Sequence, residues 1–357
     1  MPRSAKAAET ATSPPSCVPD HDAGTSLATQ VMAGLTALIR HAIPDVHELE
    51  IDRPVRSAGG LSRENWSFDA RWRDADGRHE HRLMLMRDAA GTLLQTDRMR
   101  EYHALKALEG SAVPAPRVFW ADPDGRFLAA PSLVMERVCG ACDYMVLNAA
   151  RPLAERIDLA SAFLDLMIAI QAVDWRRARL DQTLGLPSGS PADAVLAEWE
   201  SEYRRVQLEP HPELDFILAR LRAATPESQA LVLVHGDFKP GNALIDGPRI
   251  TAKLDWETAH LGDPLEDLGW VTNPVRRREH QIPRHWERGQ IVDAYRQRTG
   301  RAVDETHLTW WNVFSCWKLS VIQLTAVHEF VSGRYDRVFQ TPSWLYRPML
   351  QMLDSVA

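Results

Sequence analysis

LVLVHGDFKPGNALIDGPRITAKLDWETAHLGDP, residues 231–264, is the stretch that decides how the rest of the chain is interpreted. An apolar run leads into His-Gly-Asp (235–237), and a second apolar run ends at Asp255. Short apolar runs bounded by turn residues are typical of buried strands, and Gly236 permits a tight turn after the first one. We expect the two runs to pair, which would make Asn242 and Asp255 face the same point.

The polar residues of this stretch have the chemistry that phosphoryl transfer requires. Asn242 and Asp255 offer hard oxygen donors, which suit Mg²⁺ because that ion takes few protein ligands and completes its shell with water and phosphates. Asp237 lies outside this pair and is available to accept a proton from a substrate hydroxyl. Lys239 can place a positive charge beside the transferred group, with a solvated surface charge as the alternative. The set predicts a base, a metal site and a cation.

Other polar residues in the stretch admit structural roles. We expect His235 to brace the loop rather than to react. Asp263 and Asp267 are expected to cap or brace the following helix, with a direct metal or substrate role as the alternative. Glu257 is open between a structural role and an approach to the metal. Asp and Asn also favour ordinary turns, but their joint occurrence with two flanking apolar runs argues against that interpretation.

Before this stretch, the chain has the period-two pattern of strands. Short alternating or apolar runs predict strands at 49–56, 65–72, 81–87, around Val118 and at 132–138. Asp76-Gly77 is a hairpin signal between two of them. Helical spacing predicts one helix from Leu27 to Leu38 and a second at 96–108, capped by Thr96 or Asp97. We therefore expect an antiparallel sheet with an inserted helix over residues 45–138.

After residue 138 the apolar spacing becomes helical. Helices are predicted at 153–175, 190–209, 213–224, 287–299 and 310–330. The expected organisation is a disordered tail at 1–25, rich in Ala, Ser, Thr and Pro, a nucleotide-binding lobe at 26–138, and a helical lobe at 139–357 that carries the motif. This is an α+β chain with a small antiparallel-sheet lobe and a larger, mainly helical lobe. Two lobes form a cleft, where ligands bind.

Composition excludes several classes of protein. The 357 residues are 45% hydrophobic and 25% charged with a net charge of −7, and no basic block suggests nucleic acid as a partner. No apolar run approaches the roughly 18 residues of a membrane span, and the first 25 residues lack the apolar core of a secretory signal. The four cysteines, Cys17, Cys139, Cys142 and Cys316, do not have the spacing of a disulfide framework. Reduced thiols in a cytoplasmic protein are expected, and the lone C-x-x-C is weak evidence for metal or redox work.

The segment HGDFKPGN (235–242) followed by LDWE (254–257) resembles the catalytic and metal loops of the aminoglycoside phosphotransferase family, a branch of the protein-kinase-like superfamily. With GDPLEDLGW (262–270) close behind, it is especially similar to the kinase-like domains fused to some acyl-CoA dehydrogenases. The resemblance covers roughly residues 45–350 and implies a bilobal protein-kinase-like fold. It also implies Mg²⁺-dependent transfer of the γ-phosphoryl group of ATP or GTP to a hydroxyl of a small molecule. A hydroxyacyl-CoA-type acceptor is favoured, with aminoglycosides, macrolides, choline or homoserine as the alternatives.

The same resemblance assigns roles within the sheet lobe. SAGGLSREN (57–65) lies where the family has a loop over the nucleotide phosphates, and it carries Gly59, Gly60 and Ser62 but departs from G-x-G-x-x-G. Arg87 stands where the superfamily's strand Lys or Arg contacts phosphates. Glu101 is the implied helix partner that orients Arg87; an exposed ion pair is the alternative for these two.

The connection between the lobes completes the implied nucleotide site. The backbone from Met135 to Val138, including Glu136, would hydrogen-bond the base. Two other classes of function stay open: a non-catalytic kinase-like nucleotide-binding protein, and a metal hydrolase using His235 and the aspartates. The second is disfavoured because hydrolytic metal sites usually use more than one His. No G-x-x-x-x-G-K-[ST] motif is present, so a P-loop enzyme is excluded.

Overall fold

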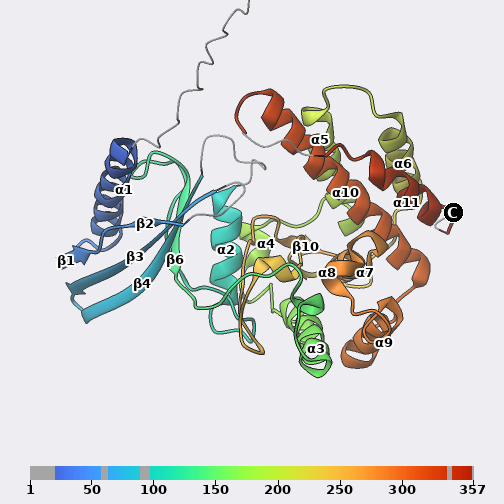
Figure 1. Ribbon diagram of the computed structural model, residues 1–357, viewed down its shortest axis with the longest axis horizontal. Helices are drawn as coiled ribbons and strands as arrows, with labels where there is room; N and C mark the ends of the chain where they lie inside the picture. The colour runs from blue at the N-terminus through green and yellow to red at the C-terminus, as the bar shows by residue number, and fades with distance from the viewer. Residues whose placement is uncertain (1–20, 58–62, 89–96, 336–339, 356–357) are drawn as a thin grey trace, which may run out of the picture.

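The computed structural model describes residues 21–57, 63–88, 97–335 and 340–355. Figure 1 shows a sheet with one helix on its outer side, followed by a larger body of helices around the C-terminal half of the chain. This arrangement has the α+β character and the lobe order that the sequence predicts. The predicted phosphate-loop residues Gly59, Gly60 and Ser62 lie outside the described residues.

Among the described residues, the N-terminal sheet is antiparallel and contains six strands. They are β1 (His47–Ile51), β2 (Val55–Arg56), β3 (Arg63–Asp74), β4 (Gly77–Asp88), β5 (Val118–Asp122) and β6 (Ser132–Glu136). The order across the sheet is β1-β3-β4-β6-β5, with β2 also paired to β3. The hairpin between β3 and β4 turns at Gly77, whose φ of 118° is readily adopted only by glycine. The predicted strand at 49–56 is therefore divided between β1 and β2.

The two faces of this sheet bury different side chains. Because side chains alternate along a strand, Leu83 and Leu85 of β4 join the core under α1 (His21–Ala42), whereas Met84 and Met86 pack towards the core that includes α2 (Arg98–Leu108). The sheet thus has an outer face covered by α1 and an inner face turned to α2 and the rest of the molecule (Figure 1). The position of a residue along β4 therefore decides whether its side chain joins the core under α1 or the core that includes α2.

Helix α1 begins inside the predicted tail. Its first residue is His21, so residues 21–25, which the sequence analysis assigned to a disordered tail, are helical. The sequence contains no proline between residue 20 and Pro44, and nothing therefore stops the helix of the following apolar stripe from extending backwards. Residues 1–20 lie outside the described part of the chain.

The helical lobe is built around one long buried helix. Its helices are α3 (Leu153–Gln171), α4 (Leu180–Thr183), α5 (Pro191–Val206), α6 (Pro212–Ala223), α7 (Leu265–Thr272), α8 (Arg277–His280), α9 (Arg288–Thr299), α10 (Glu305–Val331) and α11 (Ser343–Leu353), with single 3₁₀ turns at 146–148, 240–242 and 274–276. Helix α10 packs against α5, α6, α7 and α11. Its Trp310 and Trp311 are 1% and 0% exposed, so both belong to the core. None of the described helices is long and apolar enough to cross a membrane.

Two small strand pairs hold the motif, and they correct the predicted pairing. The first apolar run forms β7 (Val232–Val234), which pairs with β10 (His260–Gly262); the second forms β9 (Arg249–Lys253), which pairs with β8 (Ala243–Asp246). The two runs therefore do not pair with each other. A tight turn at Gly247, with φ of 57°, lets β9 fold back on the residues directly after Asn242.

Candidate active site

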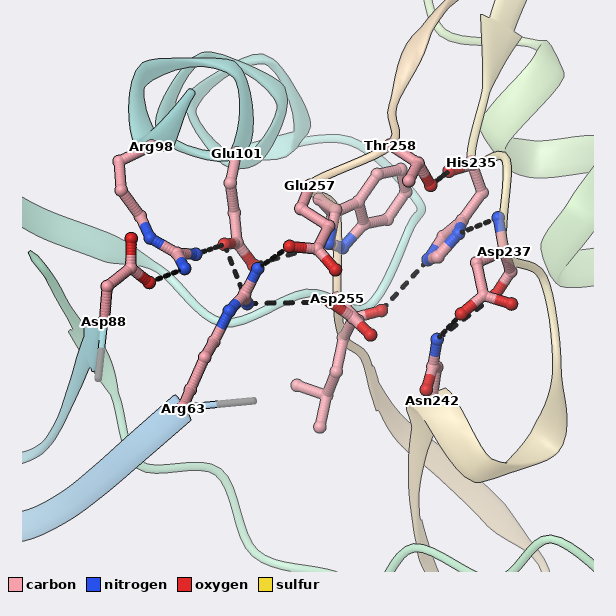
Figure 2. A network of polar contacts seen from close by, with 12 residues as sticks. Arg63, Asp88, Arg98, Glu101, His235, Asp237, Asn242, Asp255, Glu257 and Thr258 are labelled. Carbon is pink, nitrogen blue, oxygen red and sulfur yellow. Dashed lines mark hydrogen bonds and ion pairs between the residues drawn. The ribbon is translucent and has the colours of Figure 1, made fainter. Parts of the chain in front are cut away.

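The catalytic loop begins where β7 ends and turns at Gly236. Its φ of 81° favours glycine, and a Cβ there would lie 2.8 Å from the Thr258 carbonyl oxygen. The turn exposes the carboxylate of Asp237, which accepts hydrogen bonds from Lys239 Nζ at 2.5 Å and Asn242 Nδ2 at 2.9 Å. The structure thus brings together three of the residues that the sequence assigned to the site, of which Figure 2 labels Asp237 and Asn242.

Asp255 reaches the same place by way of the β8–β9 hairpin. The Leu254 amide donates to the Asn242 carbonyl oxygen at 2.8 Å, so Asn242 and Asp255 are neighbours although β7 and β9 do not pair. Asp255 has φ of 67°, a left-handed conformation that is uncommon for a non-glycine residue and recurs at functional sites. Its side chain is 32% exposed, which leaves the carboxylate accessible from the cleft.

The donor set at this point fits a magnesium ion. Among the described residues, no group of three or more His, Cys, Asp and Glu side chains is arranged to hold a metal. An Asn and an Asp oxygen on adjacent backbone are nevertheless enough for Mg²⁺, which takes its remaining ligands from water and phosphates. Asn242 and Asp255 are the two residues that would hold such an ion.

His235 braces the loop, as its sequence context suggested. The ring Nε2 donates to the Leu254 carbonyl oxygen at 2.9 Å, and Nδ1 accepts from the Asp237 amide at 3.2 Å. Burial lowers the pKa of His235 well below its usual value, so the ring is neutral at neutral pH. With both nitrogens engaged, the ring ties the catalytic Asp segment to the segment that precedes Asp255.

Asp267 and Asp263 also hold backbone amides. Asp267 accepts from the amides of His235 at 2.8 Å and Gly236 at 3.0 Å, across the 31 and 32 residues that separate them. Burial, with a smaller contribution from the charge of Glu266, raises the pKa of Asp267 to about 6. Asp263 accepts from the Leu265 amide at 2.6 Å at the start of α7. In this structure both aspartates are buried and brace backbone.

Two buried lysines outside the predicted site residues hold different parts of the loop. Lys253 Nζ donates to the carbonyl oxygens of Asn242 at 3.1 Å and Lys239 at 3.4 Å, and burial lowers its pKa to about 7. Lys318 Nζ, from α10, donates to the Gly236 carbonyl oxygen at 2.7 Å and lies 3.8 Å from Glu266. The sequence offers one sign of this role for Lys318: it is a lysine at a position of α10 that is surrounded by apolar residues.

Positive charge surrounds the carboxylate of Asp237. Burial by itself would raise the pKa of this group, but the charges of Lys239 and Arg276 outweigh burial and hold the pKa of Asp237 well below its usual range. Lys239 shows the reciprocal effect: burial lowers its pKa, while Asp237 more than compensates and raises it. Asp237 is therefore ionised, and Lys239 is its counter-ion.

On the sheet side, the cation that pairs with Glu101 is not the predicted Arg87. Arg87 Nη1 donates to Glu64 at 2.8 Å and its Nε donates to the Leu128 carbonyl oxygen at 2.8 Å, so the expected pair with Glu101 does not form. The physical reason is the alternation along β4, which places Arg87 on the outer face with Leu83 and Leu85. Glu101 instead binds Arg63 at 3.2 Å and Arg98 at 2.9 Å (Figure 2).

Part of the backbone that connects the two lobes is hydrogen-bonded within the sheet. The amide of Glu136 donates to the Arg117 carbonyl oxygen at 2.8 Å, and the amide of Arg137 donates to the Arg82 carbonyl oxygen at 2.9 Å. Val138, the last residue of the predicted base-binding segment, lies beyond these bonds. The C-x-x-C follows directly, with both thiols free and exposed.

A family model described as "Phosphotransferase enzyme family" matches residues 61–303, which is most of the chain and includes the whole motif. The curated relatives include mouse (Mus musculus) acyl-CoA dehydrogenase family member 10, which is 28% identical over 200 residues. That match spans 54% of this chain but only 18% of the mouse protein. Both findings confirm the resemblance that the HGDFKPGN and LDWE segments predict.

Solved structures with the same fold are similar along nearly the whole chain. A protein of Ralstonia eutropha JMP134, assigned as an aminoglycoside phosphotransferase, has a TM-score of 0.66 at 20% identity, over 91% of this chain and 96% of that one. A thermostable mutant of aminoglycoside phosphotransferase APH(4)-Ia, in a ternary complex with AMP-PNP and hygromycin B, has a TM-score of 0.56 at 17% identity, over 86% and 95% of the two chains. These similarities confirm the predicted α+β kinase-like fold.

Proposed function

Because the chain belongs to the phosphotransferase enzyme family, we propose that it transfers the γ-phosphoryl group of ATP or GTP to a hydroxyl of a small molecule, with Mg²⁺ as cofactor. The observation that carries this proposal is the convergence of Asp237, Asn242 and Asp255 at one end of the β7 and β8–β9 elements. One carboxylate, a two-oxygen metal site and a nearby lysine are the groups that phosphoryl transfer needs.

Each residue has a defined part in this proposal. Asn242 and Asp255 would hold Mg²⁺, which offsets charge on the phosphates. Asp237 accepts the proton of the acceptor hydroxyl. Lys239, now 2.5 Å from Asp237, is released to a phosphate oxygen when the nucleotide enters.

The charge around the acceptor side supports an anionic or amphipathic acceptor. Arg276 is buried, acts on Asp237 from the helical lobe, and stacks 4.4 Å from the centre of the Trp270 ring. Arg276 also pairs with Glu279 at 2.6 Å, which offsets part of its charge. A polycationic acceptor such as an aminoglycoside would still meet like charge from Arg276 and Lys239, whereas the phosphates of a hydroxyacyl-CoA would be attracted to them. The similarity to a protein that is named as an acyl-CoA dehydrogenase family member supports the same acceptor class.

The test is a mass-shift screen with Mg-ATP and Mg-GTP against hydroxyacyl-CoAs, hydroxy acids and aminoglycosides. We expect one acceptor to gain a phosphoryl group. Replacing Asp237 by Asn should then reduce turnover by about 10²–10⁴-fold, the usual contribution of a general base. Asp246→Asn, at the exposed end of β8, is the matched control and should retain wild-type turnover.

Three results would count against the proposal. An Asp237→Asn variant with undiminished turnover would remove Asp237 from the mechanism. Nucleotide binding without transfer to any acceptor in the panel would favour a non-catalytic kinase-like binding protein. Transfer to aminoglycosides alone would overturn the proposed acceptor class while leaving the reaction type in place.

A further inference from the structure

Arg63, the first residue of β3, joins the sheet to the metal loop. Its side chain is 7% exposed and contacts three carboxylates: Nη1 lies 3.2 Å from Glu101 and 3.5 Å from Asp255, and Nη2 pairs with Glu257. Figure 2 shows the guanidinium between the helix carboxylate on one side and the two metal-loop carboxylates on the other. Arg63 therefore links α2 of the sheet lobe to the loop that follows β9.

The carboxylate on the helix side is fixed from behind. Arg98 donates to the same oxygen of Glu101 at 2.9 Å and also pairs with Asp88, which stands opposite Arg63 in the β3–β4 register. Glu101 is 1% exposed and is held by Arg98 through the same oxygen that Arg63 contacts. Any displacement of the Arg63 guanidinium would therefore pivot about Glu101, away from Asp255.

Binding of a divalent cation would require such a displacement. Asp255 is one of the two oxygen donors of the proposed metal site, and the guanidinium now neutralises it at 3.5 Å. A metal ion on this carboxylate and a guanidinium beside it repel each other strongly in a partly buried site. The phosphates that accompany the metal bring negative charge, and the planar guanidinium fork matches a phosphate group well.

Arg63 also has one N–H donor, at Nε, that is not used within the described residues. Its Nε is buried and has no hydrogen-bond partner among the residues that the structure describes. An unsatisfied buried donor is costly and calls for an explanation. A phosphate oxygen at the cleft face of β3 would supply an acceptor that the protein itself does not provide.

We propose that Arg63 is the residue of the sheet lobe that contacts the nucleotide phosphates, and that in the ligand-free protein it serves as the internal counter-ion of Asp255 and Glu257. Binding of the metal–nucleotide complex moves the guanidinium from these carboxylates to the phosphates while Glu101 retains it. This inference rests on the proposed function for the identity of the ligand. It transfers to Arg63 the role that the sequence resemblance gave to Arg87.

The experiment measures binding rather than turnover. Calorimetric titration of Mg-AMP-PNP into wild type, Arg63→Gln, Arg63→Lys and Arg87→Gln gives nucleotide affinity, and titration of Mn²⁺ alone gives metal affinity. We expect Arg63→Gln to weaken nucleotide binding by about 10–100-fold, as for a lost charge-assisted hydrogen bond. The same variant should bind Mn²⁺ alone about tenfold more tightly, because Asp255 and Glu257 lose their counter-ion. Arg63→Lys keeps the charge and should fall between Arg63→Gln and wild type.

The opposite movement of the two affinities distinguishes a counter-ion from a structural residue, because partial unfolding would weaken both. Arg87→Gln is the matched control, an arginine on the outer face of the neighbouring strand, and should leave both affinities at the wild-type value. Equal nucleotide affinity in wild type and Arg63→Gln, or a loss confined to Arg87→Gln, would overturn the inference. A wild-type protein that binds no nucleotide would instead refute the proposed function. If Arg63→Gln does not fold, Arg63→Lys decides: unchanged affinities for both ligands refute the inference.

Discussion

Two polar networks meet at the cleft, and they are built in different ways. On the helical side, His235, Asp267, Lys253 and Lys318 each hold backbone atoms of the catalytic loop or the segment beside it. On the sheet side, the contacts run from side chain to side chain, from Asp88 through Arg98, Glu101 and Arg63 to Asp255 and Glu257 (Figure 2).

This difference has a physical consequence for each side. Backbone amides and carbonyls in a folded segment are held in place by the chain on either side. Side chains that bind them therefore fix the conformation of the loop. Carboxylates and guanidinium groups in a chain of ion pairs can exchange partners when a ligand adds charge. The loop that carries Asp237 is thus preorganised, as electrostatic catalysis requires, while the sheet-side network can respond to the nucleotide.

The largest expected effect is on the backbone-directed side. Replacing Lys318 by Met removes the donor to the Gly236 carbonyl oxygen and leaves Glu266 buried without this cation. Breaking a buried charge pair from one side costs about 3–5 kcal/mol. The free energy of unfolding in urea should fall by that amount. Lys106→Met removes a surface pair with Glu109 and is the control, with an expected loss below about 1 kcal/mol. Equal losses would show that Lys318 is not a brace.

A smaller, pH-dependent effect is expected for Asp267. Because its folded-state pKa is raised to about 6, the folded protein holds more protons than the unfolded chain between about pH 4 and 6. Stability contributed by this group therefore falls as the pH rises, by up to roughly 1.4 kcal/mol per pH unit. The difference in unfolding free energy between wild type and Asp267→Asn should decrease from pH 4 to 6 and be constant above. A difference that is flat from pH 4 to 6 would show that this carboxylate is ionised throughout.

Local sequence was sufficient for the motif but not for what surrounds it. Asp237, Asn242 and Asp255 lie within 19 residues of one another in the sequence. Turn residues and apolar runs are therefore enough to predict that they come together. The actual strand pairing was missed because β8 is only four residues long and looks like part of a loop. Asn242 and Asp255 are neighbours all the same, because the β8–β9 hairpin returns the chain to Asn242.

Long-range contacts explain the remaining errors. Lys318 lies 82 residues from the carbonyl oxygen that it binds, and no local pattern reports such a contact. Arg63 and Arg87 are both arginines on adjacent strands, and the family motif favoured Arg87. A shift of one residue along a strand reverses the face, so the choice between them depends on register, which the sequence does not give. The sequence predicted that a cation would meet Glu101, and the fold decides which one.

The smallest expected effect tests whether the sheet-side network is a rigid brace. Glu101→Gln keeps an oxygen for Arg63 and Arg98 and loses the charge together with the 3.4 Å contact to the Trp256 amide. Arg98 retains Asp88, and Arg63 retains Asp255 and Glu257, so the unfolding free energy should fall by only about 1 kcal/mol. Glu109→Gln, at the surface end of the same helix, is the control and should change stability less. A loss as large as that of Lys318→Met would mean that the ion-pair chain cannot exchange partners, and the contrast between the two networks would fail.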